Sequence, residues 1–146
     1  MRISVKCSAA VHVLLMIAML PAEKKKTSEF LATSVGNNPV EVRKALSSLK
    51  KAGIIEVARG PGGASLAREP EAISLLDIYS AVDSASLDEL IGVHGNPEPR
   101  CPFGRNIAQL LAKPYGEIGD AVREKMRQVT LRQLIEDIQQ MEPELQ

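Results

Sequence analysis

The sequence predicts a mainly α-helical fold that carries one small β-hairpin. Apolar residues recur at helical spacing in several segments, which glycine or proline separates from one another. The segment from Ile54 to Ala67 instead alternates with a period of two around a glycine-rich turn. A basic helical segment directly precedes this hairpin. This order is typical of a winged helix-turn-helix, and a long C-terminal helix that we expect to serve in dimerisation follows it.

Composition indicates one basic and one acidic half. The chain has 146 residues, 45% of them hydrophobic, which is enough for one domain with a core or a small domain with an appendage. Residues 1–68 hold eleven Lys or Arg against four Asp or Glu, whereas residues 69–146 hold seven against fourteen. The basic half is therefore expected to meet nucleic acid, and the acidic half to stay away from it.

The sequence predicts a cytoplasmic protein that does not enter a membrane. The apolar stretch from Ala9 to Leu20 contains His12 and is too short to span a bilayer. The start at Met1 and Arg2 lacks the small-residue cleavage site of a signal peptide. Two cysteines are too few for a secreted domain held together by disulfides.

Two helices and a short turn are expected to lead up to the basic helix. The first covers Ser4 to Leu20 and is followed by a charged, exposed linker up to Lys26. Thr27 caps a second helix that runs to Val35, and Gly36 with Asn37 forms the turn of the helix-turn-helix.

Strong signals mark both ends of the basic helix. Asn38 can accept a backbone N–H at the N-cap, Pro39 fits the first helical position, and Glu41 is expected to complete a capping-box-like start. Gly53 follows two lysines and can end the helix in the left-handed conformation.

This helix has one apolar and one basic face. One face carries an apolar stripe of Val42, Leu46 and Leu49, which can pack against the core but cannot form hydrogen bonds to DNA. The opposite face holds residues that can bond phosphates and base edges: Val40, Arg43, Lys44, Ser47, Lys50 and Lys51. The sequence therefore predicts a helix that enters a DNA groove.

The hairpin is interpreted as the wing. Ile54 to Ala58 and Ala64 to Ala67 are the expected strands, and Arg59 begins the turn, where it is well placed for a minor groove. A phosphate-cradling loop is the weaker interpretation, because no Lys-Ser or Lys-Thr follows at P-loop spacing. The candidate DNA-contacting residues are Thr27, Ser28, Asn38, Pro39, Val40, Arg43, Lys44, Ser47, Arg59 and Gly60.

The C-terminal half is expected to be helical apart from a proline-rich loop at residues 95–100. Two capping-box pairs predict short helices: Ser74 with Asp77 for a helix to Val82, and Ser86 with Glu89 for residues 87–93. Cys101 and Pro102 then begin a long helix whose apolar pattern is Ile107, Leu110, Leu111, Ile118, Val122, Met126 and Val129.

The apolar stripe of the long helix is longer than a small domain can bury within one chain, which favours packing against a partner. Pro114 should kink it, and two helices divided near Pro114 are the alternative. Thr130 caps a last helix from Leu131 to Gln140, in which Leu134 and Ile138 are expected to close over the core.

Cys101 is the chemically interesting residue. At a helix N-cap, the dipole and the free N–H groups lower the pKa of a thiol and raise its reactivity. A small buried residue is an equally open interpretation. Cys7 could take part only if a partner subunit brought it close. His94 is interpreted as a loop surface residue and His12 as a packed helix residue, so no metal site is expected.

Several motifs resemble the Rrf2 family of bacterial winged-helix transcriptional regulators, which includes the IscR, NsrR and CymR types. They are the run from Arg59 to Gly63, then Leu66-Ala67, Pro70-Glu71, residues 73–77, the opening Met1-Arg2-Ile3-Ser4 and the late Val129-Thr130-Leu131. The resemblance implies a homodimer on an inverted DNA repeat, with a sensor loop ahead of a long dimerisation helix. It implies a DNA-binding domain at 1–82, and a sensor loop with a helical dimerisation region at 83–146.

The resemblance is strongest to the YwnA-like subgroup, which lacks a full cluster motif. Family members often hold an iron–sulfur cluster through three loop cysteines and another ligand. This loop offers only Cys101, with His94, Asn96 and Glu98 nearby, so no cofactor is expected.

Taken together, these features predict a sequence-specific DNA-binding regulator, a repressor that responds to thiol redox state through Cys101 and Cys7. Its expected partners are double-stranded DNA and a second copy of itself. No Ser-His-Asp set, zinc spacing or paired carboxylates suggests an enzyme. The alternative is a dimeric winged-helix scaffold that does not bind DNA specifically.

Overall fold

The computed structural model describes residues 4–59 and 63–146, and it has the predicted architecture. Its elements are α1 (Lys6–Met19), α2 (Ser28–Val35), α3 (Pro39–Lys51), β1 (Ile55–Val57), β2 (Ala64–Leu66), η1 (Pro70–Ala72), α4 (Leu75–Val82), η2 (Leu87–Glu89), α5 (Pro102–Gln128), α6 (Leu131–Met141) and η3 (Pro143–Leu145). A mainly helical fold with one antiparallel hairpin is thus confirmed. Met1, Arg2 and Ile3, and Gly60 to Gly62 of the expected turn, lie outside the described residues.

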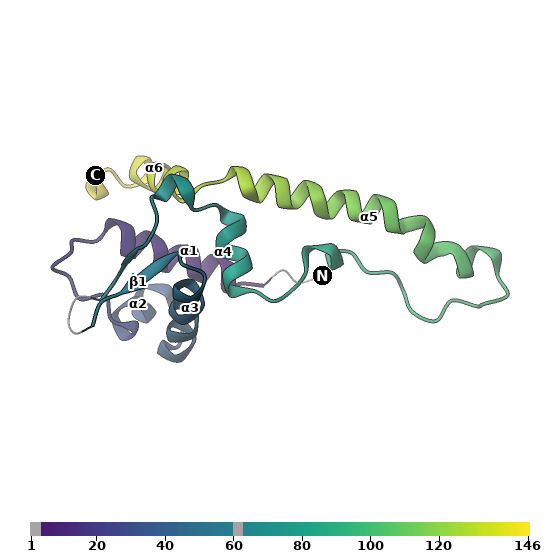
Figure 1. The fold of residues 1–146 in the computed structure, drawn as a ribbon, viewed down its shortest axis with the longest axis horizontal. Coiled ribbons are helices and arrows are strands. Elements are labelled where there is room, and N and C mark those ends of the chain that lie inside the picture. The colour runs from purple at the N-terminus through teal and green to yellow at the C-terminus, as the bar shows by residue number, and fades with distance from the viewer. Residues whose placement is uncertain (1–3, 60–62) are drawn as a thin grey trace.

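One aliphatic core joins the helices α1 to α4, both strands and α6. Its fully buried large side chains include Leu14, Leu31, Leu49, Ile54, Ile73, Ile78 and Leu131. Helix α5 contributes almost nothing to this core, because Gly119 is its one buried residue. Figure 1 shows why: α5 extends away from the body as a long arm, and residues 90–101 run outward along it to reach its start.

Helix α6 returns to the core, but in a different register from the one expected. Leu131 and Ile135 are the buried residues, whereas Leu134 and Ile138 are only half-buried, so the prediction for that pair is wrong. The reason is the attachment of the helix start. The Leu131 N–H donates to the Ile73 carbonyl at 2.8 Å, which turns Leu131 and the residue four positions later inward.

The predicted N-cap side chains Thr27, Asn38 and Ser74 all accept a backbone N–H at the starts of their helices. Thr27 accepts the Phe30 N–H at 3.1 Å, and the Ser74–Asp77 capping box is formed in both directions. At α3, the Asn38 side chain accepts the Val40 N–H at 2.8 Å. The expected reciprocal bond from Glu41 is absent there.

The reason is competition for both groups at the start of α3. The Asn38 N–H donates to the Asn37 side chain at 2.8 Å, and the Glu41 carboxylate accepts from Lys44 at 2.9 Å. The capping-box prediction for Glu41 is therefore wrong, although the N-cap itself is confirmed.

The prediction of a helix at residues 87–93 is also wrong, since only the single 3₁₀ turn η2 forms there. Ser86 accepts the Asp88 N–H at 3.1 Å rather than capping with Glu89. Tertiary contacts hold the turn: Leu87 is buried, and Arg123 of α5 binds the Asp88 carboxylate. A segment this short cannot sustain an α-helix on its own.

Helix α5 is one continuous helix with Pro114 inside it, so the alternative of two divided helices is wrong. The kink at Pro114 stays a prediction. Cys101 is the N-cap and Pro102 the first helical residue, as expected. None of the described helices is long and apolar enough to cross a membrane.

Leu131→Ala is expected to lower the free energy of unfolding by roughly 2–5 kcal/mol, because it empties a fully buried site. Met141→Ala, on the same helix at a position that is 74% exposed, is the control and should change it by less than about 0.5 kcal/mol. Urea denaturation at one fixed protein concentration measures both. Equal, small losses would show that α6 is not part of the core.

Candidate nucleic-acid interface

The turn between α2 and α3 is built as the sequence predicts. Gly36 ends α2 with a φ of +71°, a left-handed conformation that glycine adopts without strain. Its N–H donates to the Ala32 carbonyl at 2.9 Å. Asn38 then caps α3, so the two helices are joined by Gly36 and Asn37.

Helix α3 packs with its apolar stripe and exposes its basic face. Val42 and Leu49 are buried and Leu46 is half-buried. The predicted contact residues of the outer face are all exposed: Val40, Arg43, Lys44, Ser47, Lys50 and Lys51. The structure therefore brings the α3 candidates together on one solvent-facing surface.

The remaining helical candidates occupy capping positions. The Thr27 and Asn38 side chains already accept backbone N–H groups at the starts of α2 and α3. Ser28 and Pro39, beside them, are half-buried. These four residues fix how the helices begin, and a contact with DNA would be additional.

Two cations of the α3 outer face are paired with carboxylates. Arg43 lies 3.1 Å from Glu29 of α2, and Lys44 lies 2.9 Å from Glu41. All four side chains are largely exposed, and pairs of this kind stabilise a fold by only about 0–1 kcal/mol. They can therefore open when a stronger anion approaches.

The wing is a short antiparallel hairpin. Ile55 pairs with Leu66 and Val57 with Ala64, and Gly63 turns the chain with a φ of +68°. Arg59 is exposed at its end, whereas the candidate Gly60 lies outside the described residues.

Arg68, where the hairpin rejoins the body, is held by the protein itself. It donates to the Ala72 carbonyl at 3.3 Å and lies 3.8 Å from Asp77. Lys26 was expected to be exposed but is half-buried, because its ammonium donates to the Ile17 carbonyl at 3.2 Å.

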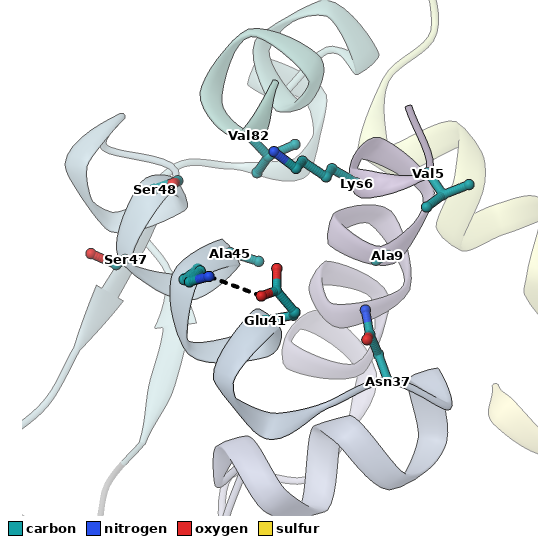
Figure 2. A pocket seen from close by; sticks show the side chains of 10 residues that line it. Val5, Lys6, Ala9, Asn37, Glu41, Ala45, Ser47, Ser48 and Val82 are labelled. Atoms are coloured by element: carbon teal, nitrogen blue, oxygen red, sulfur yellow. Dashed lines mark hydrogen bonds and ion pairs between the residues drawn. The ribbon is translucent and has the colours of Figure 1, made fainter. Parts of the chain in front are cut away.

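A cavity of about 630 Å³ lies on the flank of α3 that faces α1 and α4. Figure 2 shows it with its lining residues: Val5, Lys6, Ala9, Asn37, Glu41, Lys44, Ala45, Ser47, Ser48 and Val82. Lys44 and Ser47 thus belong both to this lining and to the outer face of α3.

Glu29 and most of this lining could not be predicted from the sequence. No local pattern points to Glu29, because its role as partner of Arg43 arises only from the packing of α2 on α3. Lys6 and Val82 lie far apart in the chain and meet only through the fold.

The two cysteines are both free thiols and are not brought together within one chain. Figure 1 places the start of α5, which Cys101 caps, at the end of the arm that lies farthest from the body and α1. Cys101 is half-buried, and its side chain makes no cap hydrogen bond. Burial raises the pKa of the Cys7 thiol, and the nearby Asp83 carboxylate raises it further.

This geometry, a helix-turn-helix followed by a hairpin wing, defines a winged-helix protein. A sequence profile of the Rrf2 family, described as "Iron-dependent Transcriptional regulator", matches residues 3–137. The chain belongs to the Rrf2 family. That family consists of transcription regulators and not of enzymes, as the sequence predicted.

The chain is similar to individual family members over nearly its whole length. It is 38% identical to YwnA of Bacillus subtilis (strain 168), named as an HTH-type transcriptional regulator, over 91% of this chain and 96% of YwnA. A crystal structure named as that of a DNA binding protein is 34% identical, with a TM-score of 0.70 over 89% of this chain and 98% of that one. CymR of B. subtilis shares the fold, at 24% identity and a TM-score of 0.66 over 93% and 97% of the two chains.

The family description names iron, but the residues of one chain do not fit an iron centre. Across residues 4–59 and 63–146, no group of three or more His, Cys, Asp or Glu side chains could hold a metal ion. His94 is exposed, as predicted. His12 is half-buried against α2, where its Nε2 lies 2.9 Å from the Ser34 hydroxyl.

Cys7 is expected to alkylate much more slowly than Cys101 at pH 7.5, because its raised pKa leaves little thiolate. Asp83→Asn removes the neighbouring charge, which should lower the pKa of Cys7 and speed its reaction. Iodoacetamide labelling across a pH series, read residue by residue by mass spectrometry, measures both rates. Fast labelling of Cys7 at neutral pH, unaltered by Asp83→Asn, would contradict the assignment.

Proposed function

We propose that the protein is a sequence-specific DNA-binding repressor that acts as a homodimer on an inverted repeat. The observation that carries this proposal is the exposed basic face of α3, which directly precedes a wing ending in Arg59. The chain's membership of a family of transcription regulators supports it. The expected compartment is the cytoplasm, where the DNA lies.

Helix α3 enters the major groove, and the wing reaches the adjacent minor groove. Arg43 and Lys44 exchange their exposed glutamate partners for phosphates or base edges. The contacts are Thr27, Ser28, Asn38, Pro39, Val40, Arg43, Lys44, Ser47, Arg59 and Gly60. Residues 1–82 form the DNA-binding domain in this proposal, and residues 83–146 form the sensor loop and dimerisation region.

A second copy of the chain covers α5. Phe103 is 85% exposed, Leu110 69% and Ile118 41%, on a helix that buries little of its length within one chain. Exposed apolar side chains repeated along one helix favour an isologous helix–helix contact, and an inverted DNA repeat requires a two-fold protein.

The redox response rests on Cys101. Its thiolate would attack peroxide and break the O–O bond, which forms a sulfenic acid and releases hydroxide, at the joint between the outer loop and the dimerisation helix. The raised pKa of Cys7 leaves little of that thiol as the thiolate that peroxide oxidises. A disulfide between the two would have to join Cys101 to Cys7 of the partner subunit.

Selection from random duplex fragments is expected to enrich a near-palindromic site that the protein binds with strong salt dependence. Arg43→Ala should lower the salt slope by about one, because one cation no longer displaces counterions. Arg132→Ala is the matched control: it also removes an arginine paired with a glutamate, but on α6, and should leave the slope unchanged. No enriched sequence and no binding at low salt would overturn the proposal and favour the scaffold alternative.

Leu110→Glu is expected to convert dimers into monomers, because it places a charge in the apolar seam of α5. Gln109→Glu adds the same charge at the neighbouring exposed position and should leave the dimer intact. Sedimentation velocity at micromolar concentration measures both variants. A wild-type chain that sediments as a monomer would contradict dimerisation through α5.

A further inference from the structure

We infer that the cavity between α1, α3 and α4 binds a small organic anion, and that this binding opposes the binding of DNA. The regulatory part of the inference rests on the proposed function, whereas the binding part does not. The cavity measures about 630 Å³, and sites for small molecules commonly measure about 300–1,000 Å³. It can therefore hold a molecule larger than a simple ion.

The walls of the cavity suit an apolar body. Ala9 of α1 and Ala45 of α3 are small side chains at places where the two helices line the same space, as Figure 2 shows. Val5 and Val82 add apolar surface from the start of α1 and the end of α4. Larger residues at the two alanine positions would fill the space, so the cavity depends on their small size.

The charged groups of the lining favour an anion over a cation. Two lysines, Lys6 and Lys44, line the cavity together with one glutamate, Glu41, which Lys44 already binds at 2.9 Å. Lys6 extends from α1 toward the end of α4 in Figure 2. A hydrogen bond from the Ala85 backbone is the main reason that the pKa of Asp83 is low, and the Lys6 charge adds to it, but Asp83 is not part of the lining.

Neutral hydrogen-bonding groups complete the site. The Asn37 amide and the Ser47 and Ser48 hydroxyls line the side formed by α3 and the turn before it. An apolar floor with a few polar groups and one excess positive charge matches a molecule with an apolar body and a single carboxylate or phosphate.

The site shares two residues with the proposed DNA surface, which couples the two ligands. A carboxylate that holds Lys44 from the cavity side withdraws this cation from DNA, and its own charge repels the nearby phosphates. By linkage, the anion and DNA must each lower the affinity of the protein for the other by the same factor. The anion would therefore act as an inducer that releases the repressor.

Benzoate, phenylacetate and hexanoate, each beside its neutral amide, are the probes. Saturation-transfer NMR on the full chain should detect the acids, with binding at least about tenfold tighter than that of the amides. Ala45→Leu and, as a second cavity-filling variant, Ala9→Leu should abolish the signal. Retained acid binding in both filled variants, equal binding of acid and amide, or no acid binding would overturn the inference.

Fluorescence anisotropy with the selected DNA site measures the coupling. Saturating acid, at matched ionic strength, should weaken DNA binding by at least about fivefold in the wild type and not in Ala45→Leu. If selection yields no DNA site, the proposed function fails, but the NMR experiment still tests anion binding in the cavity independently.

Lys6→Gln distinguishes whether Lys6 binds the small organic acid or a phosphate of DNA. It should weaken acid binding and leave the salt slope of DNA binding unchanged. A slope that falls by about one, without acid binding to the wild type, would assign Lys6 to a DNA phosphate and overturn the inference.

Discussion

Burial of one face of α1 is the interaction on which the rest of the structure depends. Ala10, Val13, Leu14 and Ile17 are buried along the helix, and α1 contacts α2, α3, α4, β2 and α6. Aromatic residues make up only 3% of the chain, so this contact is almost wholly aliphatic. Burial of each of the three larger side chains, Val13, Leu14 and Ile17, contributes about 1.5–3 kcal/mol relative to exposure. Because α1 fixes the inner side of α3, the opposite, basic side of α3 must face solvent.

The arm formed by η2 and α5 is attached to this body at both of its ends. The chain leaves through α4 and returns where the Leu75 N–H donates to the Val129 carbonyl at 2.7 Å, just before the Leu131 bond to Ile73. Along the arm, Arg123 of α5 binds Asp88 of η2 and lies 2.8 Å from Asp120. The Leu75 bond to Val129 joins the end of α5 to the start of α4, and the end of α4 lines the cavity beside α3.

Local signals in the sequence were sufficient for the architecture. Thr27, Asn38, Ser74 and Pro102 each mark a helix start within their own turn, and Gly36 marks a helix end. The errors arose where distant groups compete for the same atoms. Arg123 binds the Asp88 carboxylate where a helix was predicted. Lys44 binds the Glu41 carboxylate that was expected to cap α3. The bond from the Leu131 N–H to the Ile73 carbonyl sets the register of α6. The outer face of α3 could be predicted because one helix carries it, but the cavity could not, since three helices contribute to it.

If α3 binds DNA as proposed, its acidic partners limit unspecific binding. Glu29 and Glu41 lie beside the two cations that would meet phosphates, so any approach to a DNA backbone also brings two carboxylates near it. On a random sequence the protein gains only the phosphate contacts, and repulsion from these carboxylates offsets part of that gain. On the correct sequence, base-edge bonds add to the same contacts and outweigh the repulsion. In the proposed complex, the two glutamates would therefore lower the affinity for every sequence by a similar amount, and only a site with matching bases would retain useful binding.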